Sequence, residues 1–118
     1  MKLQEIAQFI DLDLKRIDVL FMGKEELYKK FLRKFPENVK GLLVELEEAV
    51  EKNNHEKIEA CAHAIKGVAS NLGVDKVTEF GTALMLDIRN NTPENINEHY
   101  KVLVEETEKA ITYIEQLD

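Results

Sequence analysis

Four residues that can do chemistry or make room for it lie close together between positions 63 and 70 of the chain. His63, Lys66, Gly67 and Ser70 are spaced i, i+3, i+4 and i+7, so they share one face of an α-helix. An exposed imidazole is a nucleophile near neutral pH, because one ring nitrogen can attack while the other keeps its proton. Lys66 can bring a cation to an anionic group attached to His63, and a phosphoryl group is the obvious candidate.

The helix that carries these residues is predicted at 55–72, and its core face lies on the opposite side from His63. At about 100° per residue, its apolar side chains cluster in one stripe. The stripe comprises Ile58, Cys61, Ala62, Ile65, Val68, Ala69 and Leu72. His63 falls nearly opposite the centre of this stripe and is predicted to point at solvent. Glu59 shares its outer face, one turn earlier.

Gly67 lies in the middle of an exposed helix face, where glycine costs roughly 1 kcal/mol relative to alanine. Its missing side chain leaves room for another molecule to approach the ring of His63 closely. Ala60 and Ala64 are also small, so the face around the histidine is uncluttered. From spacing alone, however, an ordinary surface histidine remains the simpler interpretation.

Helical periodicity extends over the whole chain, and no β-type alternation is sustained anywhere. The predicted helices are residues 3–10, 13–21, 24–52, 55–72, 75–89 and 92–117. The last four are long and have short connections, which predicts an all-α fold. We expect an antiparallel up-down four-helix bundle, with the two short N-terminal helices covering one end.

The ends and the interruption of these helices are also predicted. Pro36 lies inside 24–52, but the apolar spacing continues unbroken across it, so we expect one kinked helix rather than two. Gly73 should end the helix that carries His63, with Val74 making the accompanying apolar contact. The predicted N-caps of the last three helices are Asn54, Asp75 and Thr92.

The composition is that of a folded globular protein. The chain has 118 residues, of which 44% are hydrophobic and 33% charged, and we expect a single domain over residues 1–118. A net charge of −7, with acids and bases interleaved, argues against nucleic acid or an anionic membrane as the partner. The initiating Met1 and the well-capped helices favour a free-standing protein.

Compartment and metal binding follow from the few cysteines and histidines. Cys61 is the only cysteine, so no intrachain disulfide can form. No membrane-length apolar run and no signal peptide are recognisable, and we expect a cytoplasmic protein. His55 and His63 fall on roughly opposed sides of their helix, which gives no metal-ligand geometry. His99, near the core boundary of the last helix, is expected to be structural or solvated.

The run AHAIKGVASNLGV, residues 62–74, closely resembles the signature of histidine-containing phosphotransfer (HPt) domains. The matching positions are His63, Ile65, Lys66, Gly67, Ala69, Ser70, Leu72 and Gly73. Upstream, GKEELY at 23–28 is similar to the stretch that opens the family's long helix. The resemblance covers residues 13–117, with the motif highly specific and the flanks supportive. Val68 and Met85 depart from the usual pattern, and neither touches the histidine.

The resemblance implies a phosphocarrier in a two-component phosphorelay. His63 would accept a phosphoryl group from the aspartyl phosphate of a receiver domain and pass it to another receiver. Lys66 would meet the phosphate charge, Gly67 would leave clearance for the partner, and Ser70 would add a hydrogen bond. The receiver would supply Mg²⁺, while this chain would need no cofactor and have no kinase activity of its own. We expect a monomer.

One alternative stays open within the same family. An HPt-like bundle can dock on receiver domains or other signalling partners without transferring phosphate. The presence of both His63 and Lys66 argues against such a degenerate member.

Overall fold

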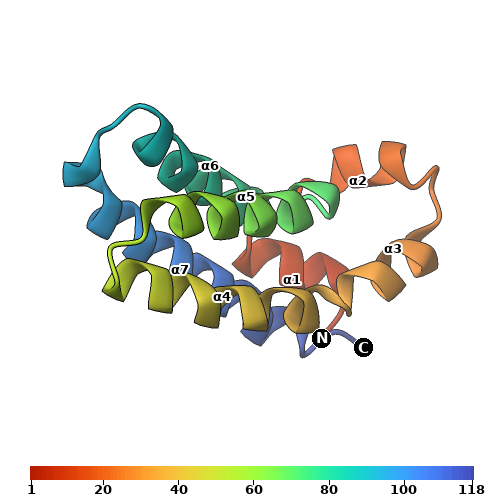
Figure 1. The fold of residues 1–118 in the computed structure, drawn as a ribbon. Helices are drawn as coiled ribbons and strands as arrows, with labels where there is room; N and C mark the ends of the chain where they lie inside the picture. The colour runs from red at the N-terminus through yellow and green to blue at the C-terminus, as the bar shows by residue number, and fades with distance from the viewer.

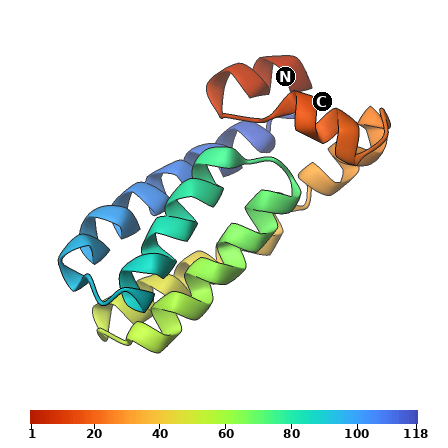
Figure 2. The ribbon, with the colours of Figure 1, turned by 90° about the horizontal axis from the view of Figure 1, so that it is seen from above.

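The computed structural model describes residues 1–118, which form helices joined by short turns (Figure 1). In chain order the elements are α1 (Leu3–Phe9), α2 (Leu14–Leu20), α3 (Glu25–Leu32), α4 (Phe35–Glu51), α5 (His55–Asn71), α6 (Asp75–Arg89), the 3-10 helix η1 (Pro93–Asn95) and α7 (Ile96–Ile114). Helices α4 to α7 form an antiparallel up-down bundle, and α1 and α2 lie at one end of it (Figure 2). The predicted all-α four-helix bundle with two short N-terminal helices is confirmed. No helix is long and apolar enough to cross a membrane.

The prediction of one kinked helix over 24–52 is wrong, because the structure divides this segment into α3 and α4. Arg33 and Lys34 separate the two helices and keep right-handed helical angles, φ −61° and −85°. Pro36 has no amide hydrogen, and in a continuous helix its ring would collide with the carbonyl of Leu32. The amide of Lys34 instead donates to a carbonyl three residues back, at 3.0 Å. The chain therefore tightens for one turn, and α3 leaves the axis of α4 (Figure 1).

The core is formed by the predicted apolar stripes, which meet along the bundle axis. The fully buried side chains include Tyr28, Leu32, Phe35, Val39, Leu46, Ile58, Ile65, Leu84, Leu103 and Ile114. Thr107 is buried among them, and its hydroxyl donates to the carbonyl of Leu103 at 2.7 Å. That bond satisfies a polar group that would otherwise destabilise the core. Burial of one face of each helix explains why these amphipathic segments are helical.

The helix ends agree with the predictions from the sequence at two positions and differ from them at two. Asn54 caps α5, since its side chain accepts from the amide of Lys57 at 3.2 Å. Gly73 ends α5 with a φ of +70°. Asp75 is not the cap of α6 but its first residue, because Val74 occupies the cap position. Thr92 caps no amide with its side chain, and its hydroxyl contacts Asp87 instead.

The N-terminal segment clamps the turn between α5 and α6. The amide of Asp13 donates to the carbonyl of Gly73 at 3.2 Å, and the amide of Asp75 donates to the carbonyl of Asp11 at 3.0 Å. Arg16 on α2 pairs with the Asp75 carboxylate at 2.8 Å. A Cβ at Gly73 would lie only 2.9 Å from the side chain of Ile17. Backbone conformation and close packing therefore both require glycine at the end of α5.

Tyr28 joins α3 to the same end of α5. Its ring is fully buried, and its hydroxyl donates to the carbonyl of Leu72 at 2.6 Å. Burial raises the pKa of this phenol, with a smaller contribution from the Asp75 carboxylate. The hydroxyl therefore stays protonated and donating at physiological pH. Since Leu72 follows the last residue of α5, its carbonyl has no partner within the helix.

We predict that Tyr28→Phe lowers the free energy of unfolding by about 1–3 kcal/mol, because it leaves the buried carbonyl of Leu72 without a donor. Tyr113→Phe is the matched control, because the Tyr113 hydroxyl makes no hydrogen bond within the protein and its ring stacks on Phe9. Urea unfolding followed by circular dichroism measures both. Equal effects of the two substitutions would contradict the role assigned to this bond.

Candidate functional site

Helix α5 presents two different faces, and His63 lies on the open one. Its inner face is buried at Ile58, Cys61, Ala62, Ile65 and Ala69. His63 is exposed, as the helical period predicted. Its ring forms no hydrogen bond or ion pair within the protein, so both ring nitrogens are free to meet another molecule.

The space beside the imidazole is open at Gly67. A Cβ built at this position would meet no atom within 4 Å. Ala60 is exposed and Ala64 is half-buried, so the neighbouring turns also carry only small side chains. The open space predicted from the sequence is therefore present in the structure.

Lys66 is the cation of this face that has no ion-pair partner. Its side chain takes part in none of the salt bridges of the protein, and the residue is half-buried. Glu59, one turn before His63, is held at 3.4 Å by Arg89 of α6. That pairing turns the nearest carboxylate of the face toward another cation and leaves Lys66 available to an incoming anion.

Gly81 of α6 positions Lys66 and was not singled out in the sequence. A Cβ at Gly81 would lie 3.0 Å from the Cβ of Lys66 and 3.3 Å from the carbonyl oxygen of Ala62. The two helices therefore pack closely along the flank of α5, beside the turn that carries His63. The sequence does show Gly81 as a second glycine within a helix, like Gly67. Its position in the sequence does not reveal whether it faces a neighbouring helix or open solvent.

Ser70 lies one turn beyond Gly67 and is half-buried. Its hydroxyl makes no hydrogen bond to another protein group, so it is free to donate to a ligand. Of the two departures from the HPt pattern, Met85 is buried and Val68 packs partly against the core. Both side chains contribute to packing rather than to the open face.

The other histidines and the cysteine do not join His63. His55 begins α5, and its Nε2 donates to Asn53 at 3.0 Å. Cys61 is buried, and burial raises the pKa of its thiol, with a further contribution from Glu45. His99 is structural, since its Nδ1 donates to the buried carboxylate of Asp87 at 2.6 Å. No group of three or more potential metal-ligating side chains occurs in the chain.

Asp87 is a polar residue that the sequence reasoning missed, and it organises the turn from α6 to α7. The residue is only 5% exposed, and its second carboxylate oxygen accepts from the Thr92 hydroxyl at 3.3 Å. Together with the bond from His99, these contacts satisfy a buried charge. An acid at a helix end usually predicts a solvated surface group, so periodicity gave no sign of this pairing.

The comparison with known families agrees with the geometry around His63. The family model described as Hpt domain matches residues 26–117, which is most of the chain and includes all of α4 to α7. The chain belongs to the Hpt domain family. No curated protein and no solved structure matches it significantly.

Membership of this family assigns the fold and the general activity. Hpt domains are helical bundles that act in histidine phosphotransfer and interact with receiver domains in phosphorelays. The match begins within α3, so α1 and α2 of this Hpt domain lie outside it. Helix α2 and the segment before it nevertheless hold the end of the helix that carries His63.

The two mid-helix glycines of the site should respond oppositely to alanine. Gly67→Ala is expected to raise the free energy of unfolding by about 0.5–1 kcal/mol, because alanine is the better helix former and its methyl group meets open space. Gly81→Ala should lower it by up to about 2 kcal/mol, because the cost of overpacking the contact with Lys66 and Ala62 exceeds the same gain in helix propensity. Thermal and urea unfolding measure both. A stabilising Gly81→Ala would show that the helices are not in close contact there.

Proposed function

We propose that this Hpt domain accepts a phosphoryl group on His63 from the aspartyl phosphate of one receiver domain and passes it to a second receiver. The observation that carries the proposal is an exposed imidazole without any intramolecular partner, beside open space at Gly67. The family match supports the class of reaction, and the site residues are our assignment.

The transfer replaces a P–O bond to aspartate by an N–P bond to histidine, and then reverses this exchange on the second receiver. A ring nitrogen of His63 attacks phosphorus in line, the N–P bond forms, and the P–O bond to the aspartate breaks with its electron pair on the carboxylate. In the second step a receiver aspartate attacks the same phosphorus and the imidazole leaves. Such transfers depend mainly on positioning and on neutralising charge. Mg²⁺ in the receiver would supply most of that charge, and this chain would supply no cofactor.

Lys66 and Ser70 are proposed to meet the phosphoryl oxygens. The unpaired ammonium of Lys66 lies within one turn of His63 and is backed by the packing of its stem on Gly81. The free hydroxyl of Ser70 can donate one hydrogen bond. Gly67 is proposed to let the receiver approach the imidazole without a side chain in its path.

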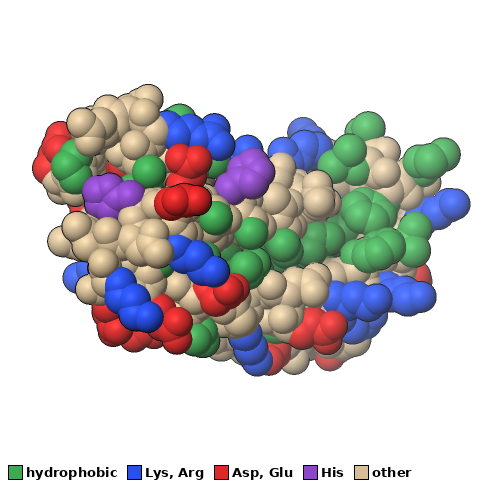
Figure 3. Space-filling view, viewed as in Figure 1, with side chains coloured by type: hydrophobic (Ala, Val, Ile, Leu, Met, Phe, Trp, Pro, Cys, Tyr) green, Lys and Arg blue, Asp and Glu red, His purple; other side chains and the backbone are tan.

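The α2–α3 apolar patch is a docking surface suited to that receiver. We define it by Val19, Leu20, Met22, Leu27 and Phe31. Met22 and Val19 are 80% and 75% exposed, which is unusual for large apolar side chains on one short hairpin. Figure 3 shows hydrophobic side chains over this end of the molecule, continuing toward the middle of the bundle on the face where α5 lies in Figure 1.

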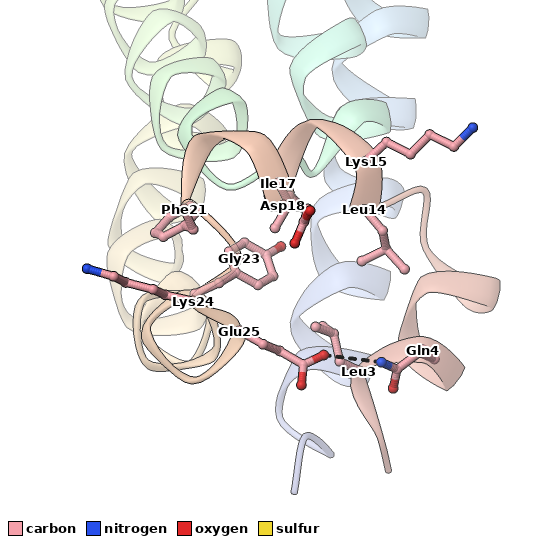
Figure 4. A pocket seen from close by; sticks show the side chains of 11 residues that line it. Leu3, Gln4, Leu14, Lys15, Ile17, Asp18, Phe21, Gly23, Lys24 and Glu25 are labelled. Atoms are coloured by element: carbon pink, nitrogen blue, oxygen red, sulfur yellow. Dashed lines mark hydrogen bonds between the residues drawn. The ribbon is translucent and has the colours of Figure 1, made fainter.

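A cavity of about 330 Å³ adjoins the patch between α1, α2 and α3. Figure 4 shows Leu3, Leu14, Ile17 and Phe21 around it, while Lys15 and Lys24 extend away into solvent. Gln4 donates to Glu25 across it at 3.1 Å. The cavity therefore offers an apolar recess with polar groups at its edge, which suits an apolar anchor of a docked partner.

The central test is transfer from a receiver domain charged with radiolabelled acetyl phosphate. We expect acid-labile, base-stable label on the wild-type domain and on His55→Gln, and none on His63→Gln. The His55 variant is the control for loss of an imidazole elsewhere on the same helix. Label on His63→Gln would contradict the assignment of the acceptor. Docking of receivers without label on any variant would support the non-transferring module instead.

Disrupting the α2–α3 apolar patch should weaken binding of the receiver without changing the rate of phosphoryl transfer in the complex. For Leu20→Asp combined with Met22→Asp, we expect the receiver concentration at half-maximal rate to rise about tenfold or more, since apolar contacts of this size are each worth about 1.5–3 kcal/mol. The rate at saturating receiver should stay near that of wild type. Val44→Asp, on α4 and 57% exposed, is the matched control. Equal effects of the patch and control variants would remove the patch from the interface.

A further inference from the structure

A second concave surface lies between α4 and α7, in the layer of the bundle opposite α5 and α6 (Figures 1 and 2). It is a groove of about 440 Å³ whose floor is apolar. The floor comprises Leu43, Val44, Tyr100, Val104 and Ile111. Val44 is 57% exposed, so this part of α4 is left uncovered. The groove is not used by the transfer proposed for His63.

The shape of the groove matches the face of a helix. Tyr100 and Thr112 mark its extent along α7, and twelve residues of helix span about 18 Å, or just over three turns. A groove between two helices can take a third helix, whose apolar residues at i, i+3, i+4 and i+7 fill it. A partner helix of about three turns would therefore bury the exposed floor.

The rim of the groove is acidic. Glu47 and Glu108 line it from opposite helices, and neither takes part in an ion pair within the protein. Lys40, the basic residue of the lining, is neutralised by Glu115 at 3.0 Å. Burial raises the pKa of Tyr100, and the nearby carboxylates of Glu47, Glu51 and Glu108 add to that shift. The field over the apolar floor is therefore negative and favours a cationic occupant.

We propose that the α4–α7 groove binds a basic amphipathic helix of a partner protein, with apolar residues on the floor and Lys or Arg side chains against Glu47 and Glu108. A second copy of this chain fits the groove poorly, because a symmetric pairing would bring two acidic rims together. The proposal is independent of phosphotransfer and concerns a different face of the bundle.

The test uses a synthetic fourteen-residue peptide with leucine at positions i, i+3, i+4 and i+7 and lysine on both flanks. Titrated into the ¹⁵N-labelled domain, it should shift the amide resonances of α4 and α7 and leave those around His63 unchanged. The same peptide with glutamate in place of lysine should not bind. Resonance shifts that map to other helices, or equal binding of both peptides, would overturn the proposal.

Matched variants separate rim charge from total charge. Glu47→Lys combined with Glu108→Lys should weaken binding of the lysine peptide about tenfold or more. Glu56→Lys combined with Glu94→Lys makes the same change of net charge at exposed sites outside the groove. This control variant should lose less than half as much peptide-binding free energy as the groove variant. Equal weakening by the two double variants would mean that attraction is nonspecific and would reject the site.

Three further measurements keep the outcomes distinct. Val44→Asn places a neutral polar side chain on the apolar floor and should weaken binding of the lysine peptide, whereas unchanged binding would remove the floor from the site. Sedimentation should give a monomer for the free domain, and a dimer that buries α4 and α7 would overturn the proposal. His63→Gln should bind the peptide like wild type, so a failure of phosphotransfer would leave this test unaffected.

Discussion

The close approach of α6 to α5 at Gly81 is the contact on which the site depends. Because Gly81 has no side chain, the backbone of α6 comes directly against Ala62 and Lys66. Burying that side of α5, with Ile65, fixes the rotation of the helix about its axis. His63 then has no position open to it except the solvent side. This tight contact on the flank of α5, together with the buried inner face, therefore fixes which way His63 points.

The C-terminal end of α5 is held by a separate set of contacts. The segment before α2 pairs with the turn at Gly73, Arg16 reaches Asp75, and Tyr28 binds the carbonyl of Leu72. A nucleophile on a helix fixed both in the middle and at one end keeps its orientation, as in-line transfer requires. Residues before the family match thus contribute to a helix inside it.

Periodicity predicted the long helices, the exposure of His63 and the clearance at Gly67, because each depends on one helix considered alone. The bundle followed from the number of long helices and the shortness of their connections. Periodicity could not predict features that depend on which helices meet. Gly81 and Gly67 are both glycines within a helix, yet one faces a neighbouring backbone and the other faces solvent. The regular spacing of apolar residues across Pro36 concealed the division into α3 and α4. Arg33 and Lys34 keep helical backbone angles, so the apolar residues stay on one face although the i to i−4 hydrogen bonds of the helix are interrupted.

The same limit explains why the α2–α3 apolar patch was not visible in the sequence, where Val19 and Leu20 simply belonged to an apolar helix. A helix as short as α2 is not stable by itself and depends on what it packs against. It is anchored by Ile17 against Gly73 and by Arg16 against Asp75, that is, by the turn that ends α5. Under the proposed function, a receiver that docks on the α2–α3 apolar patch would therefore contact the same short helix that holds the end of α5 at Gly73.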